Sequence, residues 1–179
     1  EIRVERYGFH TGKGGLMKQR IERKIMTLSE AAEWRAELRK LGKKLALTNG
    51  CFDLLHRGHA EYLLAARESA DALIVLLNSD ESIRRLKGPS RPICTETDRA
   101  FMLACFEFID AVVVFGSERC DGEIATVAPD VYVKGGDYTV EKLDPGERSA
   151  LSGCGAEIRF IPFVPGCSTT ALIEKSRKS

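Results

Sequence analysis

Short apolar runs alternate with amphipathic segments along most of the chain. Five apolar runs predict strands at residues 44–50, 72–78, 111–115, 131–134 and 157–163. Apolar residues at helical spacing predict helices at residues 29–41, 58–69, 80–86, 96–108, 118–128 and from 168 onward. The first helix also carries a start signal, because Thr27 and Glu30 stand at the spacing of a capping box.

This order of segments predicts the fold class. Strands as apolar as these are usually covered on both faces, which favours a parallel sheet. Right-handed crossovers then give an α/β fold, a doubly wound, Rossmann-like sheet of five parallel strands with helices on both faces. Such sheets bind ligands at the carboxyl ends of their strands. The rule points to residues 48–59, 78–91, 134–138 and 166–170.

The first 26 residues differ from the rest, because they combine basic residues and glycines with little periodicity. We expect a single domain over residues 27–179. Residues 1–26 are expected to be a basic N-terminal extension that is either mobile or the product of an over-extended start.

Composition narrows the function classes. The chain has 27 basic and 26 acidic residues, so bulk charge does not favour binding to nucleic acid or to a membrane surface. The longest apolar run, Ala100–Phe106, is far shorter than a membrane-spanning helix requires. None of the six cysteines forms a CxxC pair, which predicts reduced thiols in a cytoplasmic protein and no metal site.

The strongest chemical signal lies between Thr48 and His59. His56 and His59 stand three positions apart at the start of an expected helix, so their side chains share one face. Gly58 leaves the helix start open to a ligand, and the free N–H groups there favour an anion such as phosphate. Taken alone, the pattern is also compatible with two solvated histidines.

Two further segments could bind a nucleotide. Ser168, Thr169 and Thr170 open the last helix, where hydroxyl groups can hold a phosphate or simply cap the helix. Gly135 and Gly136 follow a strand and permit close approach of the backbone to a flat ligand, or merely a turn.

Residues 50–59 (GCFDLLHRGH) resemble the GxFDxLHxGH signature of the HxGH nucleotidyltransferases, the cytidylyltransferase-like superfamily. Residues 168–170 resemble its C-terminal STT pattern. Residues 78–80, 84–88, 91–93 and 133–138 resemble one branch, the D-glycero-β-D-manno-heptose 1-phosphate adenylyltransferases. The resemblance extends over residues 27–177, with a departure at residues 143–147.

The resemblance implies transfer of AMP from ATP to heptose 1-phosphate, giving ADP-heptose and pyrophosphate for lipopolysaccharide core synthesis. It implies that Mg²⁺ enters with ATP without named protein ligands, that the partners are ATP and a phosphorylated sugar, and that the chain forms a homodimer. Its catalytic residues would be His56, His59 and Lys87, with Lys87 spanning both substrates.

The implied ATP site is larger. Besides the two histidines it comprises Thr48, Asn49, Gly50, Phe52, Asp53, Lys134, Gly135, Gly136, Asp137, Tyr138, Ser168, Thr169 and Thr170. Within this set Asp137 would meet the ribose, while the serine and threonines would hold the β- and γ-phosphates. Candidates for contact with phosphate or substrate are Arg91, Arg99 and Asn78. Arg99 would hold the histidine region or a phosphate in place, although it could equally lie on a solvated helix face.

Two alternatives stay open at the level of sequence. One is another nucleotidyltransferase of the superfamily, resembling glycerol-3-phosphate cytidylyltransferase or FMN adenylyltransferase. The other is a nucleotide-binding sensor without catalytic activity.

Overall fold

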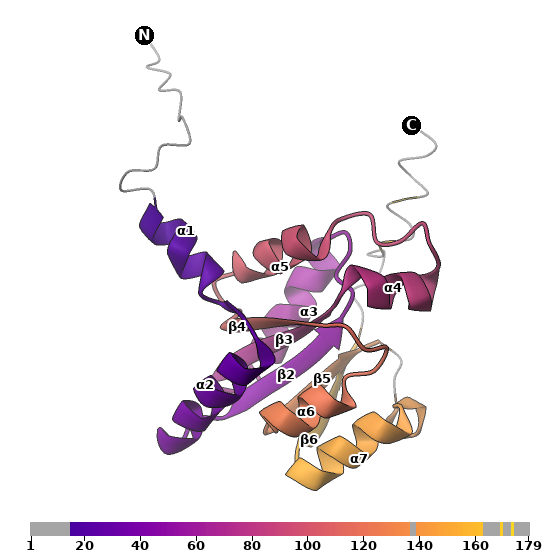
Figure 1. The fold of residues 1–179 in the computed structure, drawn as a ribbon. Coiled ribbons are helices and arrows are strands. Elements are labelled where there is room, and N and C mark those ends of the chain that lie inside the picture. The colour runs from indigo at the N-terminus through magenta and orange to yellow at the C-terminus, as the bar shows by residue number, and fades with distance from the viewer. Residues whose placement is uncertain (1–14, 137–138, 163–168, 170–172, 174–179) are drawn as a thin grey trace.

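A computed structural model describes residues 15–136, 139–162, 169 and 173. Within them, six parallel strands form one sheet in the order β1-β4-β3-β2-β5-β6 (Figure 1). The strands are β1 Ile25–Met26, β2 Leu45–Gly50, β3 Ala72–Asn78, β4 Ala111–Phe115, β5 Val131–Gly135 and β6 Glu157–Ile161. The helices are α1 Gly15–Glu22, α2 Leu28–Lys40, α3 Arg57–Arg67, α4 Asp80–Lys87, α5 Glu96–Ala104, α6 Asp121–Val127, α7 Pro145–Cys154 and the 3-10 helix η1 Val140–Lys142.

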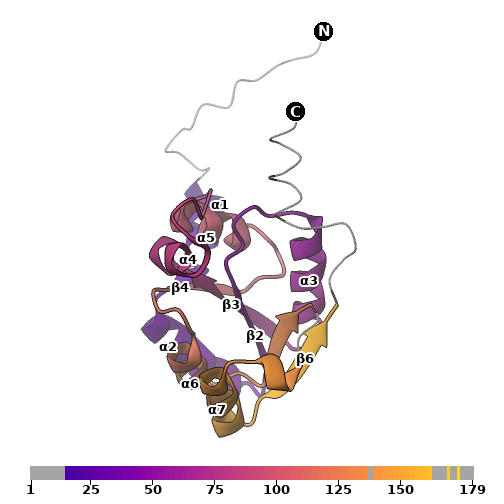
Figure 2. The same ribbon diagram turned by 90° about the vertical axis from the view of Figure 1, so that its right-hand side faces the viewer.

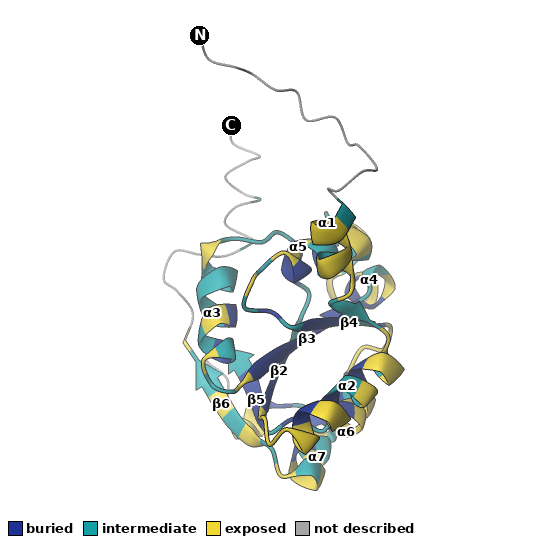
Figure 3. Ribbon diagram, turned by 90° about the vertical axis from the view of Figure 1, so that its left-hand side faces the viewer, coloured by how far each residue is buried: buried dark blue, intermediate teal, exposed yellow. Residues whose placement is uncertain are grey.

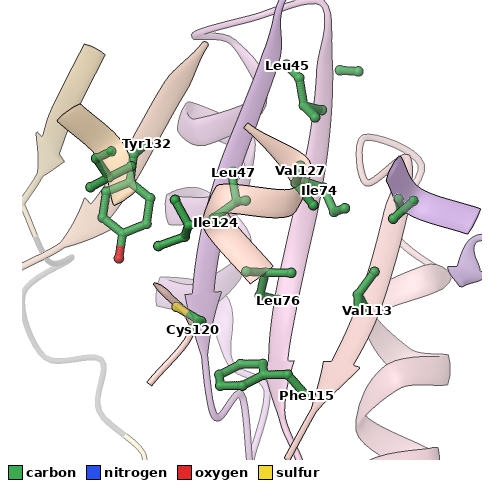
Figure 4. Close-up of a cluster of buried hydrophobic side chains, with 14 of the residues drawn as sticks. Leu45, Leu47, Ile74, Leu76, Val113, Phe115, Cys120, Ile124, Val127 and Tyr132 are labelled. Carbon is green, nitrogen blue, oxygen red and sulfur yellow. The ribbon is translucent and has the colours of Figure 1, made fainter. Parts of the chain in front are cut away.

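Helices cover both faces of the sheet, as its apolar strands predicted (Figure 2). On one face, Leu47 and Ile74 pack with side chains from α2, α6 and α7. Figure 4 shows them beside Ile124 and Val127 of α6. On the other face, Leu73 and Val75 pack with side chains from α3 and α5. Consecutive strand residues point to opposite faces, so β3 is buried over its whole length (Figure 3).

Three aspartates fix the amino ends of the central strands. Each stands one residue before a strand, and its carboxylate accepts a hydrogen bond from a backbone N–H at the start of the neighbouring strand. These bonds join Asp71 to Lys44 N at 2.8 Å, Asp110 to Leu73 N at 2.9 Å, and Asp130 to Leu45 N at 2.7 Å. They help to set the register at the end of the sheet opposite the expected site.

The structure confirms the α/β class and corrects the strand count. The sixth strand, β1, and the helix α1 lie in residues 15–26, where we expected an extension without regular structure. The expected strands recur with shifts of one or two residues, and the capping box of Thr27 and Glu30 is present. Helices α5 and α6 are shorter than expected, and α7 was not expected. Of the last helix, Thr169 and Ile173 are described, and both are helical.

Removing residues 1–26 should therefore destabilise the protein. Strand β1 pairs with β4, the carbonyl of Lys24 accepts a 2.7 Å hydrogen bond from Val112 N, and Lys24 Nζ donates to the carbonyl of Phe106 at 2.9 Å. We expect the free energy of unfolding in urea to fall by about 2–3 kcal/mol. Removal of residues 1–14 alone keeps these contacts and serves as the control. Equal stability of the two truncated proteins would contradict this role for β1.

Candidate active site

The order in which the chain adds strands reverses between β2 and β5, and the expected ligand site lies at this point. The chain winds from β2 to β3 and β4 on one side, and β5 and β6 lie on the other side of β2. The crossovers leave the sheet in opposite directions at this point, and in doubly wound sheets the crevice that binds ligands lies at such a switch point, which here is the carboxyl ends of β2 and β5. Gly50 ends β2 and Gly135 ends β5, so two of the glycine-containing segments found in the sequence meet at this crevice.

The loop after β2 is shaped by Phe52. Its backbone has a φ of 43°, which is uncommon for a residue other than glycine, and its ring is buried. A Cβ atom on Gly50 would lie 3.0 Å from Cε2 of this ring, so the ring occupies space that only glycine leaves free. The ring also meets that of His59 edge to face, with 5.4 Å between centroids. Gly50 and Phe52 therefore shape the loop that supports the histidine pair, and this packing does not require either residue to contact a ligand.

His56 and His59 lie together at the start of α3. His56 is the N-cap residue, and its carbonyl accepts a 2.9 Å hydrogen bond from His59 N. The two rings stack with 3.9 Å between centroids and 22° between planes. The Nδ1 atom of each ring is buried and has no hydrogen-bond partner in the described part of the chain. A buried polar atom without a partner is costly, so both atoms are suited to receive a ligand.

Electrostatics keep the histidine pair neutral in the absence of a ligand. Burial lowers the pKa of His59 to about 4, and the nearby His56 and Lys87 add to this effect, while a hydrogen bond to the Leu54 backbone opposes it. Burial also lowers the pKa of His56. The contribution of Lys87 shows that its cation lies within electrostatic reach of His59. A bound anion would favour the protonated form of both rings and offset the repulsion that Lys87 exerts on that form.

The lowered pKa of His59 predicts a pH-dependent stability. In the unfolded chain this histidine binds a proton below its ordinary pKa of 6.5, but in the folded chain it does so only near pH 4. Its contribution to stability is therefore complete above pH 6.5 and is lost progressively as the pH falls toward 4. The urea midpoint is measured at about pH 7.5 and at about pH 4.5, and the drop between the two should be larger for the wild type than for His59→Gln. Equal falls would contradict the neutral, buried state.

Lys87 is exposed at the last position of α4. Within the described residues it makes no hydrogen bond or ion pair, so its ammonium group can turn toward a substrate. The helix itself is fixed from β3, because Asn78 Nδ2 donates to Ser82 Oγ at 3.0 Å and that hydroxyl donates to the Ser117 carbonyl at 2.8 Å. Asn78, expected as a substrate contact, is buried and positions α4.

Asp53 joins the histidine loop to the loop before α5. Its carboxylate accepts hydrogen bonds from Arg91 Nε at 2.6 Å, Ile93 N at 2.8 Å and Cys94 N at 3.0 Å. Burial alone would raise the pKa of Asp53, but the hydrogen bonds from Cys94, Ile93 and Arg91 outweigh it, and the pKa lies below its ordinary value. Asp53 thus supports the loop, and Arg91 is held beside it.

Arg99 is a buried clamp and not a solvated residue. Only 2% of its surface is exposed. Its guanidinium donates to the carbonyls of Cys94 at 3.1 Å and Cys51 at 2.6 Å, and to the carboxylate of Asp80 at 2.8 Å. These contacts tie the histidine loop to α4, which carries Lys87. Of the two interpretations left open by the sequence, the structure favours the one in which Arg99 holds the histidine region.

Some of the remaining residues expected to contact ATP lie within the described chain, and others lie outside it. Thr48 is fully buried, and its hydroxyl lies 2.5 Å from that of Tyr62, so it links β2 to α3. The backbone N–H of Gly136 donates to the Ile161 carbonyl at 2.8 Å, with a φ of 96° that favours glycine. Asn49 and Lys134 belong to a buried polar network described below. Asp137, Tyr138, Ser168 and Thr170 lie outside the described residues, and Thr169 is half-buried.

Three members of that network, Cys120, Tyr132 and Glu147, were not expected from the sequence as site residues. Glu147 is 93% buried on α7, in the segment 143–147 whose departure from the resemblance was its only signal. That segment starts the helix, because Asp144 accepts a hydrogen bond from Gly146 N at 2.8 Å and Pro145 occupies the first turn.

A metal-binding cluster, a membrane-spanning helix and a disulfide bond are all absent from the described residues. They contain no group of three histidine, cysteine or acidic side chains placed to hold a metal ion. Among them, no helix is both long and apolar enough to cross a membrane. The five described cysteines, Cys51, Cys94, Cys105, Cys120 and Cys154, are free thiols.

Comparison with known proteins identifies close relatives. The bifunctional protein HldE of Rhodopseudomonas palustris is 48% identical over 147 residues, which are 82% of this chain and 29% of that protein. The HldE of Citrifermentans bemidjiense is 46% identical over 152 residues, which are 85% of this chain and 31% of that protein. The chain therefore spans less than a third of the length of these curated relatives.

The fold has a counterpart among solved structures. A lipopolysaccharide core biosynthesis protein from Thermoplasma volcanium GSS1 superposes with a TM-score of 0.56 and 26% identity, covering 69% of this chain and 98% of that one. The profile of the family described as cytidylyltransferase-like matches residues 47–175, well over half of the chain. Together with the parallel sheet and the histidine pair at the start of α3, this match shows that the chain belongs to the cytidylyltransferase-like family.

Proposed function

We propose that the protein transfers AMP from ATP to D-glycero-β-D-manno-heptose 1-phosphate, giving ADP-heptose and pyrophosphate. The observation that carries the proposal is the stacked pair of His56 and His59, whose buried Nδ1 atoms have no partner in the described chain, within electrostatic reach of Lys87. Such a site suits a polyphosphate. The heptose is supported by the sequence resemblance at residues 78–93 and 133–138 and by the HldE relatives.

In the proposed reaction, an oxygen of the sugar 1-phosphate attacks the α-phosphorus of ATP. The bond between that phosphorus and the oxygen bridging to the β-phosphorus breaks, and pyrophosphate leaves with its electron pair. The attacking oxygen is already an anion, so no strong general base is required. The protein must instead bring two polyanions together and neutralise the charge that shifts onto the leaving group.

The histidine pair is suited to the α- and β-phosphates. A neutral imidazole can donate one N–H to a phosphate oxygen, and the negative charge of ATP raises the pKa of both rings toward the cationic form. Because Phe52 and the backbone of α3 fix the rings in place, little reorganisation is needed when charge develops. We assign His59 to the transition state and His56 to the neighbouring oxygens.

Lys87 and Arg91 face the second substrate in this proposal. Lys87 has no competing partner in the described chain and can span the α-phosphate and the sugar phosphate. Arg91 is held at 2.6 Å by Asp53, and 19% of its side chain is exposed. One bond to Asp53 leaves other guanidinium N–H groups for a phosphate.

The nucleotide would lie at the turn after β5. Gly135 and Gly136 permit close approach to the base, and by resemblance Asp137 meets the ribose while Tyr138 lies beside the adenine. Also by resemblance, Ser168, Thr169 and Thr170 hold the β- and γ-phosphates. We take MgATP as the substrate, with Mg²⁺ held by phosphate oxygens and water. Cytoplasmic location is a further expectation from the cysteine pattern, and a homodimer is one from the family resemblance.

A substrate panel tests this function. Pyrophosphate release is measured with ATP, CTP and GTP against heptose 1-phosphate, glucose 1-phosphate, glycerol 3-phosphate and FMN. We expect ATP with heptose 1-phosphate to exceed every other pair by at least about tenfold in kcat/KM, because a mismatched base leaves buried polar groups unpaired. Preference for CTP with glycerol 3-phosphate, or for FMN as acceptor, would replace the proposal with the corresponding alternative. Nucleotide binding without any turnover would favour a sensor.

A further inference from the structure

A buried polar network joins β2, β5, α6 and α7 at the crevice. Its members are Asn49, Cys120, Tyr132, Lys134 and Glu147. Lys134 Nζ donates to Asn49 Oδ1 at 2.9 Å and to the Tyr132 hydroxyl at 3.1 Å, and lies 3.7 Å from Glu147 Oε2. The Tyr132 hydroxyl lies 2.9 Å from Asn49 Oδ1 and 3.1 Å from Glu147 Oε2, while Glu147 Oε1 faces Cys120 Sγ at 3.4 Å and Asn49 Nδ2 at 3.5 Å.

The network lies beyond the point where the backbone pairing of β2 with β5 ends. Register pairs between β2 and β5 are limited to Ala46–Val131 and Leu47–Tyr132. By contrast, β2 pairs with β3 as far as Gly50, and β5 pairs with β6 as far as Gly135. Toward the crevice, β2 and β5 are therefore joined by side chains. Figure 4 shows the Tyr132 hydroxyl pointing toward the carboxyl end of β2, with Cys120 beyond it.

The network adjoins both halves of the candidate site, namely the loop that carries the histidine pair and the turn at Gly135 and Gly136. Asn49 immediately precedes Gly50, where the loop to the histidine pair begins. Lys134 immediately precedes Gly135 and Gly136, where the turn proposed to meet the nucleoside begins. Glu147 supplies the buried anion opposite Lys134, and 16% of the Lys134 side chain and 9% of the Glu147 side chain are exposed. A buried ion pair is weak evidence for stability alone, but it can fix one arrangement of the chain.

We propose that Glu147 is a positioning residue for nucleotide binding, acting through Lys134 and Asn49 to fix the spacing between the histidine loop and the Gly135–Gly136 turn. This inference rests on the proposed function, because it assumes that ATP occupies both sides of the crevice. It predicts an effect that depends on ligand length. ATP spans both halves and needs the correct spacing, whereas inorganic pyrophosphate needs only the half with the histidines.

The test compares the affinities of ATP and inorganic pyrophosphate, measured by calorimetry without any sugar phosphate. In Glu147→Gln the side chain keeps its size and loses its charge, and we expect the Kd of ATP to rise about tenfold while that of pyrophosphate changes less than about twofold. Glu157→Gln, which changes an exposed glutamate of β6, should leave both values unchanged. Wild-type affinity for both ligands, or equal weakening of both, would overturn the positioning role.

A second variant keeps the test decisive if Glu147→Gln does not fold. Tyr132→Phe removes only the hydroxyl that contacts Asn49, Lys134 and Glu147. It should weaken ATP about threefold and spare pyrophosphate, and an unchanged Kd of ATP would overturn the inference. The outcome is separable from the proposed function, because a wild type that binds ATP but adenylylates no sugar phosphate overturns that function alone.

Discussion

Replacing His59 with alanine should lower kcat by about 10²- to 10³-fold while the protein stays folded. The ring stacks on His56, meets Phe52 edge to face and has a buried Nδ1 without a partner in the described chain. A donor fixed in this way stabilises charge in the transition state without reorganising. Its loss should therefore affect kcat at saturating substrate and not only KM.

The measurement is pyrophosphate release at saturating ATP and sugar 1-phosphate. Leu64→Ala, on the exposed side of the same helix, is the matched control and should retain turnover. Circular dichroism and the Tm of both variants establish that α3 is intact. If His59→Ala turned over within about threefold of the wild type, the role assigned to His59 would be wrong.

Lys87→Ala should also lower kcat about 10²-fold, with a rise of no more than about threefold in the Kd of ATP. Lys87 is exposed and without a partner among the described residues, yet its charge is felt by His59. A side chain on the end of α4 can meet both phosphates only when both substrates are bound. Its contribution should therefore be largest in the transition state.

Lys40→Ala is a close control, because Lys40 is likewise an exposed lysine at the last position of a helix, α2, and its pair with Glu37 is solvent-exposed. It should leave both turnover and ATP affinity unchanged. Turnover is measured with both substrates saturating, and ATP affinity is measured separately by calorimetry. A collapse of ATP affinity with normal saturated turnover would make Lys87 an anchor for the ground state instead.

The central strands could be predicted because their apolar runs are local signals. Residues 72–78 and 111–115 are almost entirely apolar and are buried in the sheet, so the run of apolar residues is enough to identify each strand. Strand β1 has only two residues and depends on the edge of β4, which no local pattern records. Helix α7 contains Gly146 and Gly153 and few apolar positions, and its stability comes from packing against α6.

The same distinction applies to the candidate site. The proximity of His56 and His59 follows from their spacing in one helix turn, and the structure bears out their meeting. The partners of Arg99 lie between 5 and 48 positions away, so its place as a clamp could not be derived from helix periodicity. Glu147 reaches Asn49 across 98 positions of sequence, which is why only the fold reveals it.

The three aspartates at the amino ends of the strands hold one end of the sheet as a fixed frame and leave a rim of loops at the other end for the candidate site. Asp71, Asp110 and Asp130 bind backbone N–H groups, and Arg67 and Arg35 pair with Asp110 and Asp130, so the alignment is set by contacts at this end of the sheet. The rim at the opposite end can then change its loops without a shift of the strands beneath. Efforts to alter the acceptor specificity of the proposed reaction should begin at residues 88–90, which leave those anchors and the contacts of Arg91, Ile93 and Cys94 with Asp53 untouched.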